Sequence, residues 1–240
     1  MARKHILRTL GGLALLLVLA ALLRPAGAEA RPVSAWQAGP YLALTFDDGP
    51  WPGTTETLLD GLAERGVKAT FFLIGSQVEA RRDTVARMAA EGHQIGLHTW
   101  DHVSLNGCGP AAIQRQLDPC RAALTAIVGP TDFMLRPPYG MVDDALRQWA
   151  QAPIICWSVD TEDWKDKDPA RILQVCLDEA KDGAVILMHD IYPTSVQAAL
   201  QAVDALLARG YRFVTVEDLF ALRGKTPEPG AVYLSLPPQS

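Results

Sequence analysis

The run Tyr41-Leu42-Ala43-Leu44-Thr45-Phe46-Asp47-Asp48-Gly49-Pro50 is the first segment of the chain with the pattern of a buried strand. An apolar run of this length that stops at a Gly-Pro turn is typical of a strand inside a sheet. An amphipathic stretch follows at residues 54–65, with Leu58 and Leu62 at helical spacing, and Gly66 closes it. A second apolar run occupies residues 69–74. This order predicts parallel strands that are joined by helices.

The same alternation continues along the chain. The later apolar runs cover residues 94–97, 133–135, 154–159, 184–188 and 212–214, and the later amphipathic stretches cover residues 78–91, 110–128, 168–181 and 194–209. Seven apolar runs alternating with helical segments predict one α/β domain. We favour a closed or nearly closed (β/α) barrel over an open sheet, because no glycine-rich dinucleotide-binding motif follows the first strand.

The N-terminus has the pattern of a secretory signal peptide. Three basic residues precede an apolar run at residues 10–23, and an Ala-x-Ala-like sequence follows it. We expect a signal peptide over residues 1–28, with cleavage after Ala28 or alternatively after Ala30, and export to the periplasm or the medium. A retained membrane anchor is the alternative. The remaining divisions that we predict are a linker at 29–40, the main domain at 41–223 and a peripheral tail at 224–240.

The charge of the chain argues against nucleic acid or an anionic membrane as a partner. The full chain carries a formal net charge of −5, and residues 1–28 contain four basic residues and no acidic ones. The exported protein is therefore more acidic than the full chain and would be repelled by a polyanion. We expect a monomer.

Export also affects the interpretation of the four cysteines, since an even number usually pairs in an oxidising compartment. Cys108 with Cys120 and Cys156 with Cys176 are the shortest of the three possible sets of pairs. We favour Cys108–Cys120 most, because Cys108 lies in a glycine-flanked loop. The alternative is four small buried thiols.

Two sets of polar residues have the pattern of a metal site. Asp47 and Asp48 are adjacent at the end of a predicted strand, so their side chains point to opposite sides, and one can bind a metal while the other faces a bound water. His98 and His102 would share one face if the chain turns helically there, which suits a common metal. The alternatives are a solvated turn and a surface histidine pair.

Three further polar clusters follow later predicted strands. They are Arg136-Pro137-Pro138-Tyr139-Gly140, Asp160-Thr161-Glu162-Asp163-Trp164 and Leu187-Met188-His189-Asp190. All of these clusters lie at the carboxyl ends of strands, the face on which barrels of this type carry their chemistry. His93 lies outside every cluster, and we interpret it as structural.

The sequences of these clusters, and their order along the chain, resemble those of carbohydrate esterase family 4, the NodB-type polysaccharide deacetylases. The resemblance covers Tyr41 to Phe220 and includes Thr-Phe-Asp-Asp-Gly-Pro, His-Thr-x-x-His, Arg-x-Pro-Tyr-Gly, Asp-x-x-Asp-Trp and Leu-x-His-Asp. It implies a distorted (β/α)7-8 barrel, a single catalytic domain, and metal-dependent removal of acetyl groups from a glycan.

The resemblance also implies a role for each motif residue. Asp48, His98 and His102 would hold one divalent metal ion, zinc by default, with cobalt or nickel also accepted. Asp47 would be the general base, and Arg136 would pair with it.

The remaining implied roles concern the proton donor and the acetyl group. His189 would be the general acid, and Asp163 would orient it, with Asp160 as the second candidate. The backbone N–H of Tyr139 would bind the oxyanion, and the walls of the acetyl pocket would be Trp164 and Leu187.

Three classes of function compete on these residues. Our choice is a hydrolase that removes N-acetyl groups from an N-acetylglucosamine-containing polysaccharide, such as peptidoglycan, chitin oligomers or an exopolysaccharide. An O-acetyl esterase acting on a glycan such as xylan would use the same site. Two histidines and a carboxylate also suit a non-haem iron oxygenase, although strand–helix alternation argues against its usual scaffold. A non-catalytic sugar-binding protein would not need Asp47, Arg136 and His189 together.

Overall fold

The computed structural model describes residues 39–238. The predicted signal peptide and nearly all of the predicted linker lie outside these residues. Within them, no helix combines the length and the apolar character that crossing a bilayer requires. The elements in chain order are β1 (Tyr41–Asp47), α2 (Thr54–Glu64), β2 (Thr70–Leu73), α3 (Gly75–Val78), η2 (Glu79–Arg81), α4 (Arg82–Ala90), β3 (Gln94–Leu97), α5 (Pro110–Val128), η3 (Pro138–Gly140), α6 (Asp144–Trp149), β4 (Ile154–Ile155), β5 (Val159–Asp160), α7 (Asp163–Asp166), α8 (Pro169–Glu179), β6 (Val185–His189), α9 (Pro193–Ala208), β7 (Arg212–Phe213), α10 (Val216–Leu222) and β8 (Val232–Tyr233).

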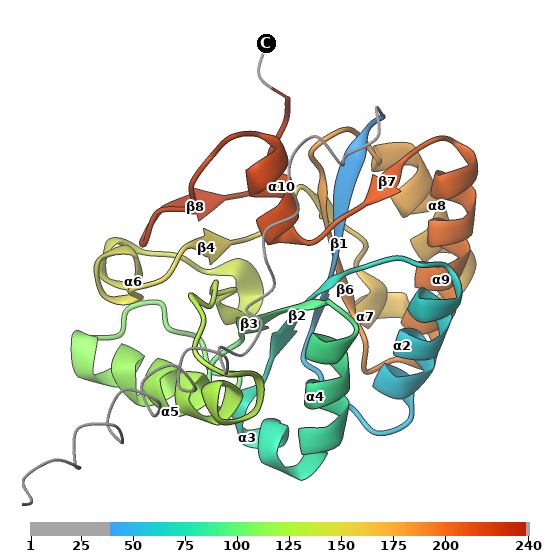
Figure 1. The fold of residues 1–240 in the computed structure, drawn as a ribbon. Helices are drawn as coiled ribbons and strands as arrows, with labels where there is room; N and C mark the ends of the chain where they lie inside the picture. The colour runs from blue at the N-terminus through green and yellow to red at the C-terminus, as the bar shows by residue number, and fades with distance from the viewer. Residues whose placement is uncertain (1–38, 239–240) are drawn as a thin grey trace, which may run out of the picture. The chain divides into compact units, whose positions relative to one another are not determined.

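The named strands pair in parallel, with helices packed around them (Figure 1). Isolated bridges and one chain segment close these pairings into an incomplete ring. The main sheet has the order β3-β2-β1-β6-β5, and β7 also pairs with β1. Leu135 bridges Leu97 of β3 on one side and Ile154 of β4 on the other. Because β4 and β5 are consecutive parts of one segment, residues 154–160 connect the two ends of the sheet. The prediction of a single α/β domain with a parallel sheet is confirmed, and the ring is a distorted barrel.

Two predicted strands differ from expectation. The run at residues 133–135 contributes only the bridge at Leu135, and the run at 154–159 is divided into β4 and β5. The side chain of Arg136 explains the division. Its Nε donates to the carbonyl of Ile155 and its Nη2 to that of Cys156, each at 3.0 Å. The carbonyl at the end of β4 and the one that follows it thus bind a side chain where the strand is interrupted.

The register of β1 places its polar end among other strand ends. All seven residues of β1 are buried, as expected for a strand covered on both faces. Asp47 lies opposite His189 of β6 and opposite Phe72 of β2. The carboxyl ends of β1 and β6 therefore bring a carboxylate and an imidazole to one edge of the ring.

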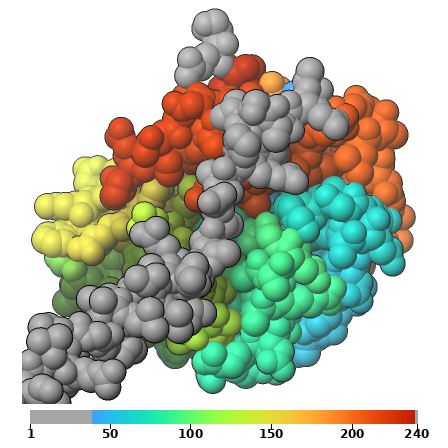
Figure 2. Space-filling model, viewed as in Figure 1, coloured from blue at the N-terminus to red at the C-terminus, as the bar shows by residue number. Residues whose placement is uncertain are grey.

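The C-terminal tail is part of the fold, so the prediction that it is peripheral is wrong for residues 232–236. Strand β8 pairs in parallel with β4, and the N–H of Leu236 donates to Gly183 O at 2.8 Å. Leu236 is 1% exposed. Gly183 permits this approach, because a Cβ on it would lie 2.2 Å from Leu236 O. Figure 2 shows the red C-terminal segment lying directly against the yellow segment that includes β4.

The predicted disulfide between Cys108 and Cys120 is absent, since all four cysteines are free thiols. Cys120 points into the core from α5, where its thiol lies 3.7 Å from Leu73 O. It also packs against Gly75, on which a Cβ would lie 2.8 Å from the Cβ of Cys120. The thiol of Cys108 instead lies 3.8 Å from Ser104 O. Cys120 therefore serves as a small packing residue where α3 meets α5.

Candidate active site

Strand β1 delivers two carboxylates in different directions. Asp47 is its last residue and is 3% exposed, whereas Asp48 has a left-handed backbone with φ of 73°. This change of conformation turns the chain immediately after the strand. The two adjacent side chains consequently have different partners.

Asp48 lies between two histidines. Its Oδ1 is 3.3 Å from His98 Nε2 and 3.2 Å from His102 Nε2. One ligand atom from each of the three residues lies within 4.8 Å of the other two. Two imidazoles and one carboxylate are a donor set that zinc and related divalent ions accept, with positions left open for further ligands.

The His98–His102 segment is not helical, so the helical turn on which their common face depended is absent. Thr99 and His102 have left-handed backbones, with φ of 64° and 56°. This loop brings the two rings to a centroid distance of 4.9 Å. His98 Nδ1 lies 2.7 Å from Arg136 O. A carbonyl accepts only from an N–H, so Nδ1 carries a proton and Nε2 is the ring nitrogen directed at Asp48.

The polar atoms of this group fit a bound cation. Asp48 Oδ1 is buried and has no hydrogen-bond donor within the described residues. Burial alone would raise the pKa of Asp48, but hydrogen bonding with His98 and the charges of His98, His189 and His102 lower it below the ordinary value. An ionised carboxylate oxygen within 3.3 Å of one imidazole nitrogen and 3.2 Å of another is an arrangement that a metal ion stabilises.

Asp47 is held by a fully buried arginine. Arg136 Nη1 lies 2.8 Å from Asp47 Oδ1 and donates to Thr45 Oγ1 at 2.7 Å. The guanidinium also lies 4.2 Å above the Phe72 ring. A buried ion pair requires such a complete set of partners, because an unpaired charge there would be strongly destabilising. The other oxygen, Asp47 Oδ2, lies 3.7 Å from His98 Nε2.

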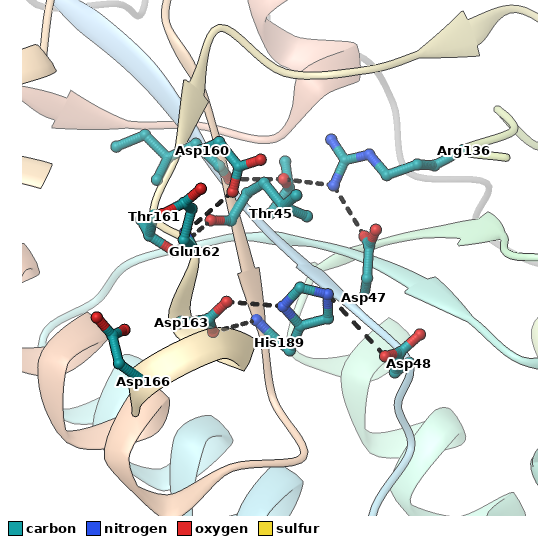
Figure 3. Close-up of polar contacts among 12 residues, drawn as sticks. Thr45, Asp47, Asp48, Arg136, Asp160, Thr161, Glu162, Asp163, Asp166 and His189 are labelled. Carbon is teal, nitrogen blue, oxygen red and sulfur yellow. Dashed lines mark hydrogen bonds and ion pairs between the residues drawn. The ribbon is translucent and has the colours of Figure 1, made fainter. Parts of the chain in front are cut away.

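His189 and Asp163 form a second pair beside Asp48 (Figure 3). His189 Nδ1 lies 2.7 Å from Asp163 Oδ1, and the backbone N–H of His189 donates to Asp163 Oδ2 at 2.8 Å. Burial alone would lower the pKa of His189, but the hydrogen bond and charge of Asp163 lead the effects that raise it to about 9. The Nε2 atom lies 4.0 Å from Asp48 Oδ2. Asp160, the second candidate partner, is exposed and accepts from the Glu162 N–H instead.

The three residues predicted to contact the acetyl group lie in three different elements. Tyr139, in η3, is 65% exposed and has a left-handed backbone, and its ring lies 5.1 Å from that of His102. Trp164 is the second residue of α7 and is 51% exposed. Leu187 is buried in β6, paired with Thr45 and Asp160.

Comparisons with known proteins agree with this geometry. The sequence profile described as polysaccharide deacetylase matches residues 37–153. The chain is 37% identical to a chitooligosaccharide deacetylase of Sinorhizobium fredii, over 82% of this chain and 91% of that protein. The chain belongs to the polysaccharide deacetylase family.

Two further relatives of this family are informative. The peptidoglycan-N-acetylmuramic acid deacetylase PdaC of Bacillus subtilis is 40% identical over 74% of this chain, but the match spans only 38% of that protein. The structure of a family 4 acetyl xylan esterase from Clostridium thermocellum, in complex with cobalt, superposes with a TM-score of 0.79 at 30% identity. That match covers 82% of this chain and 99% of the esterase chain.

This member of the family contains a buried carboxyl group to which no role was assigned from the sequence. Asp190 is fully buried, and its Oδ2 accepts from the hydroxyl of Thr55 at 2.5 Å. Burial raises the pKa of Asp190 to about 7. A Cβ on Gly49 would lie 2.5 Å from Asp190 Oδ2, so glycine is needed there. Asp190 thus packs between α2 and the loop that follows Asp48. The sequence signal was a carboxylate directly after an apolar strand, but Thr55 is 135 residues away and no local pattern connects the two.

Left-handed backbone conformations are concentrated in this site. Besides Asp48, Thr99, His102 and Tyr139, Glu162 next to Asp163 also has a positive φ, of 49°. Such a conformation costs a non-glycine residue roughly 1–2 kcal/mol, and it persists only where the surrounding structure imposes it. The fold therefore holds the site in a conformation that the local sequence alone would not choose.

Proposed function

We propose that this protein is a metal-dependent hydrolase that removes N-acetyl groups from an N-acetylglucosamine-containing polysaccharide. The observation that carries the proposal is the convergence of three groups. The Asp48–His98–His102 donors lie between Asp47, which is paired with Arg136, and His189, which is paired with Asp163. The names of relatives in the family specify deacetylation of chitooligosaccharides and of peptidoglycan.

Asp48, His98 and His102 would hold one divalent ion, and we propose zinc as the native metal. A bound divalent ion polarises a carbonyl oxygen and lowers the pKa of water at the site. The proton that fixes the His98 tautomer lies on Nδ1, so its Nε2 is free to act as a ligand. The solved relative with cobalt supports acceptance of other divalent ions.

Asp47 would be the general base. Its Oδ1 is occupied by Arg136 at 2.8 Å, which leaves Oδ2 directed toward His98 and the centre of the site. A base in a fixed orientation within hydrogen-bond reach of the attacking water satisfies the geometric requirement for proton removal. Arg136 would hold this carboxylate in a fixed orientation, because its own remaining donors are engaged by the backbone carbonyls of Ile155 and Cys156.

His189 would be the general acid. Its Nδ1 is engaged by Asp163, so its Nε2 is the atom that delivers a proton to the departing amine. The exposed position of Tyr139 beside His102 supports a role for its backbone N–H in binding the oxyanion. Trp164 and Leu187 would contact the acetyl methyl group.

O-acetyl ester hydrolysis is the second candidate activity. The structural similarity to an acetyl xylan esterase supports it. An ester requires the same base and oxyanion donors, but its leaving alcohol depends less on a protonated His189 than an amine does. The nature of the leaving group therefore separates the two substrates.

The proposal extends to the location of the protein. Deacetylation of a cell-wall or secreted glycan requires export, and the basic, apolar and Ala-x-Ala-like pattern of residues 1–28 supports a signal peptide. We propose that the exported protein is a monomer that begins after Ala28 and contains a catalytic domain over residues 41–223. Mass spectrometry of exported protein tests this, because an intact Met1 would contradict it.

Acetate release from a panel of acetylated glycans tests the activity. The panel contains chitin oligomers, peptidoglycan and acetylated xylan, and each is incubated with zinc-loaded protein and with Asp47→Asn as the blank. We expect release from at least one N-acetylated glycan and lower turnover on xylan. Release from xylan alone would favour the esterase, and release from none of them would contradict the proposed function.

A further inference from the structure

A cavity of about 340 Å³ lies beside the proposed metal ligands, and the mechanism above does not use it. Its lining includes Pro50, Trp51, Ser76, Gln77 and Arg81. The loop after β1 supplies the first two residues, and α3 with η2 supplies the other three. A volume of this size is within the range of small-ligand sites.

Both walls of the cavity are connected to the proposed metal ligands. Pro50 is two residues after Asp48, so their Cα atoms are at most about 7.6 Å apart. On the other wall, the N–H of Ser76 donates to the carbonyl of Trp100 at 3.0 Å, and Trp100 lies between His98 and His102 in the chain. A ligand in the cavity would therefore lie next to the reacting group.

Trp51 offers an aromatic platform in this cavity. It is 45% exposed, although its backbone N–H is fixed by Thr55 Oγ1 at 2.8 Å. A large aromatic ring that remains exposed on an ordered backbone can bury apolar area when a ligand stacks on it, at little cost in conformational freedom.

The opposite wall offers the guanidinium of Arg81, which makes a single hydrogen bond within the described residues. Arg81 Nε is buried and has no acceptor within the described residues, and the guanidinium donates only from Nη1, to Ala80 O at 3.0 Å. The nearby carboxylate of Glu56 is engaged by the Gly53 N–H and by the Thr84 hydroxyl. The Nη2 atom of Arg81 makes no hydrogen bond within the described residues, so this end of the guanidinium can donate to a ligand oxygen.

We propose that this cavity is a subsite for the sugar ring adjacent to the one that loses its acetyl group. The ring stacks its C–H face on Trp51, and Arg81 and Gln77 bind the hydroxyl or acetamido oxygens at its rim. A carbohydrate is the class of ligand that combines an apolar face with a rim of oxygens, as the two walls require. The inference rests on the proposed function, because it takes the deacetylated ring to be part of an oligosaccharide. Trp51 and Arg81 are then specificity-determining residues that bind substrate without taking part in the chemistry.

Direct binding tests the subsite independently of turnover. The zinc-loaded Asp47→Asn protein is titrated calorimetrically with the pentamer of N-acetylglucosamine, with and without Trp51→Ala. We expect Trp51→Ala to weaken Kd about tenfold and Trp51→Phe to restore most of the affinity. Equal Kd values with and without Trp51→Ala would overturn the inference, and so would the absence of pentamer binding by the parent protein.

Kinetics with the otherwise wild-type protein provide the second measurement. Trp51→Ala should raise KM for the pentamer about tenfold and leave kcat and zinc content unchanged within twofold. Arg81→Gln should raise KM several-fold. The matched control is Arg82→Gln, since Arg82 is exposed and paired with Glu79 at 3.0 Å, and it should leave KM unchanged. A fall in kcat or zinc content at constant KM would overturn the inference, because Trp51 would then act through the metal loop. Absence of acetate release by the wild type would contradict the proposed function, while calorimetry would still decide the subsite.

Discussion

At the scale of single residues, the site depends on the different surroundings of two adjacent aspartates. Asp47 is paired with Arg136, and Asp48 faces the two imidazoles. Removing the charge of a metal ligand should release the metal. Removing the charge of a proton-transfer group should lower kcat while the metal stays bound. The two residues can therefore be separated by substitution.

The first prediction is that Asp47→Asn keeps its metal and Asp48→Asn loses it. Asp47→Asn should lower kcat roughly 10²–10⁴-fold, the usual range for a positioned proton-transfer group. Metal content by mass spectrometry and acetate release are measured on both proteins. Loss of the metal in Asp47→Asn would show that Asp47 is a ligand and that the division of roles is wrong.

The second prediction concerns pH. His189 must be protonated to donate, and its pKa is raised to about 9, so activity should fall as the pH rises through about 9. In Asp163→Asn the burial that lowers this pKa remains, while the hydrogen-bonded charge that raises it is gone. The alkaline limb of kcat/KM should consequently move to lower pH. An unchanged limb in Asp163→Asn would mean that another group donates the proton.

Sequence motifs locate the residues of this site well, but not the conformations that join them. Each cluster ends an apolar run, and parallel strands bring such ends to one edge. The left-handed backbones of Thr99 and His102 could not be read from a His-x-x-x-His spacing, which equally suits a helix. The partnership of Asp190 with Thr55 arises only from tertiary packing.

At the scale of elements, the β8 segment shows a limit of pattern reading. Two strand residues near several prolines and glycines provide too short a period to identify a strand. The segment contributes to the fold through the residues that it covers, since Leu236 is in direct backbone contact with Gly183. The division of residues 154–159 could likewise not be predicted from that run, because the side chain that binds its carbonyls, Arg136, comes from a neighbouring segment.

The third prediction compares two leucines of this tail. Leu236 is 1% exposed and Leu234 is 56% exposed. Leu236→Ala should lower the free energy of unfolding by about 2–5 kcal/mol through lost burial and a residual cavity. Leu234→Ala, the matched control, should change it by no more than about 0.5 kcal/mol. Urea denaturation measures both, and equal effects would indicate that the tail does not belong to the cooperative unit.

At the scale of the whole molecule, one histidine makes stability depend on pH. His93 is 6% exposed, and its Nδ1 accepts from the Ala69 N–H at 3.1 Å, which requires a neutral ring. Burial lowers the pKa of His93 to about 4, with a smaller contribution from the charge of Lys68. Its interpretation as a structural residue fits these contacts.

The fourth prediction follows from the proton balance at His93. Between pH 6.5 and pH 4 the unfolded chain binds a proton at this position and the folded chain does not, so the contribution of His93 to stability should fall as the pH falls through this window. Asp190 contributes with the opposite sign, because its raised pKa makes the folded chain bind the extra proton. The loss is about 2 kcal/mol by pH 5. Denaturant unfolding of the wild type and of His93→Gln at pH 7 and pH 5 isolates this loss, because the change in unfolding free energy on acidification should be about 2 kcal/mol more favourable to folding in His93→Gln. An identical difference in both proteins would assign the acid sensitivity to other groups.

The barrel as a whole was predictable because strand–helix alternation and the order of the polar clusters support the same topology. The central claim is that this topology assembles one metal site that is required for deacetylation. The most direct test is to strip the protein with a chelator and titrate it with zinc while measuring acetate release from the glycan that it deacetylates. The account predicts no release before titration and a linear rise that saturates at one ion per chain. Full activity in the stripped protein, or saturation at a different stoichiometry, would contradict it.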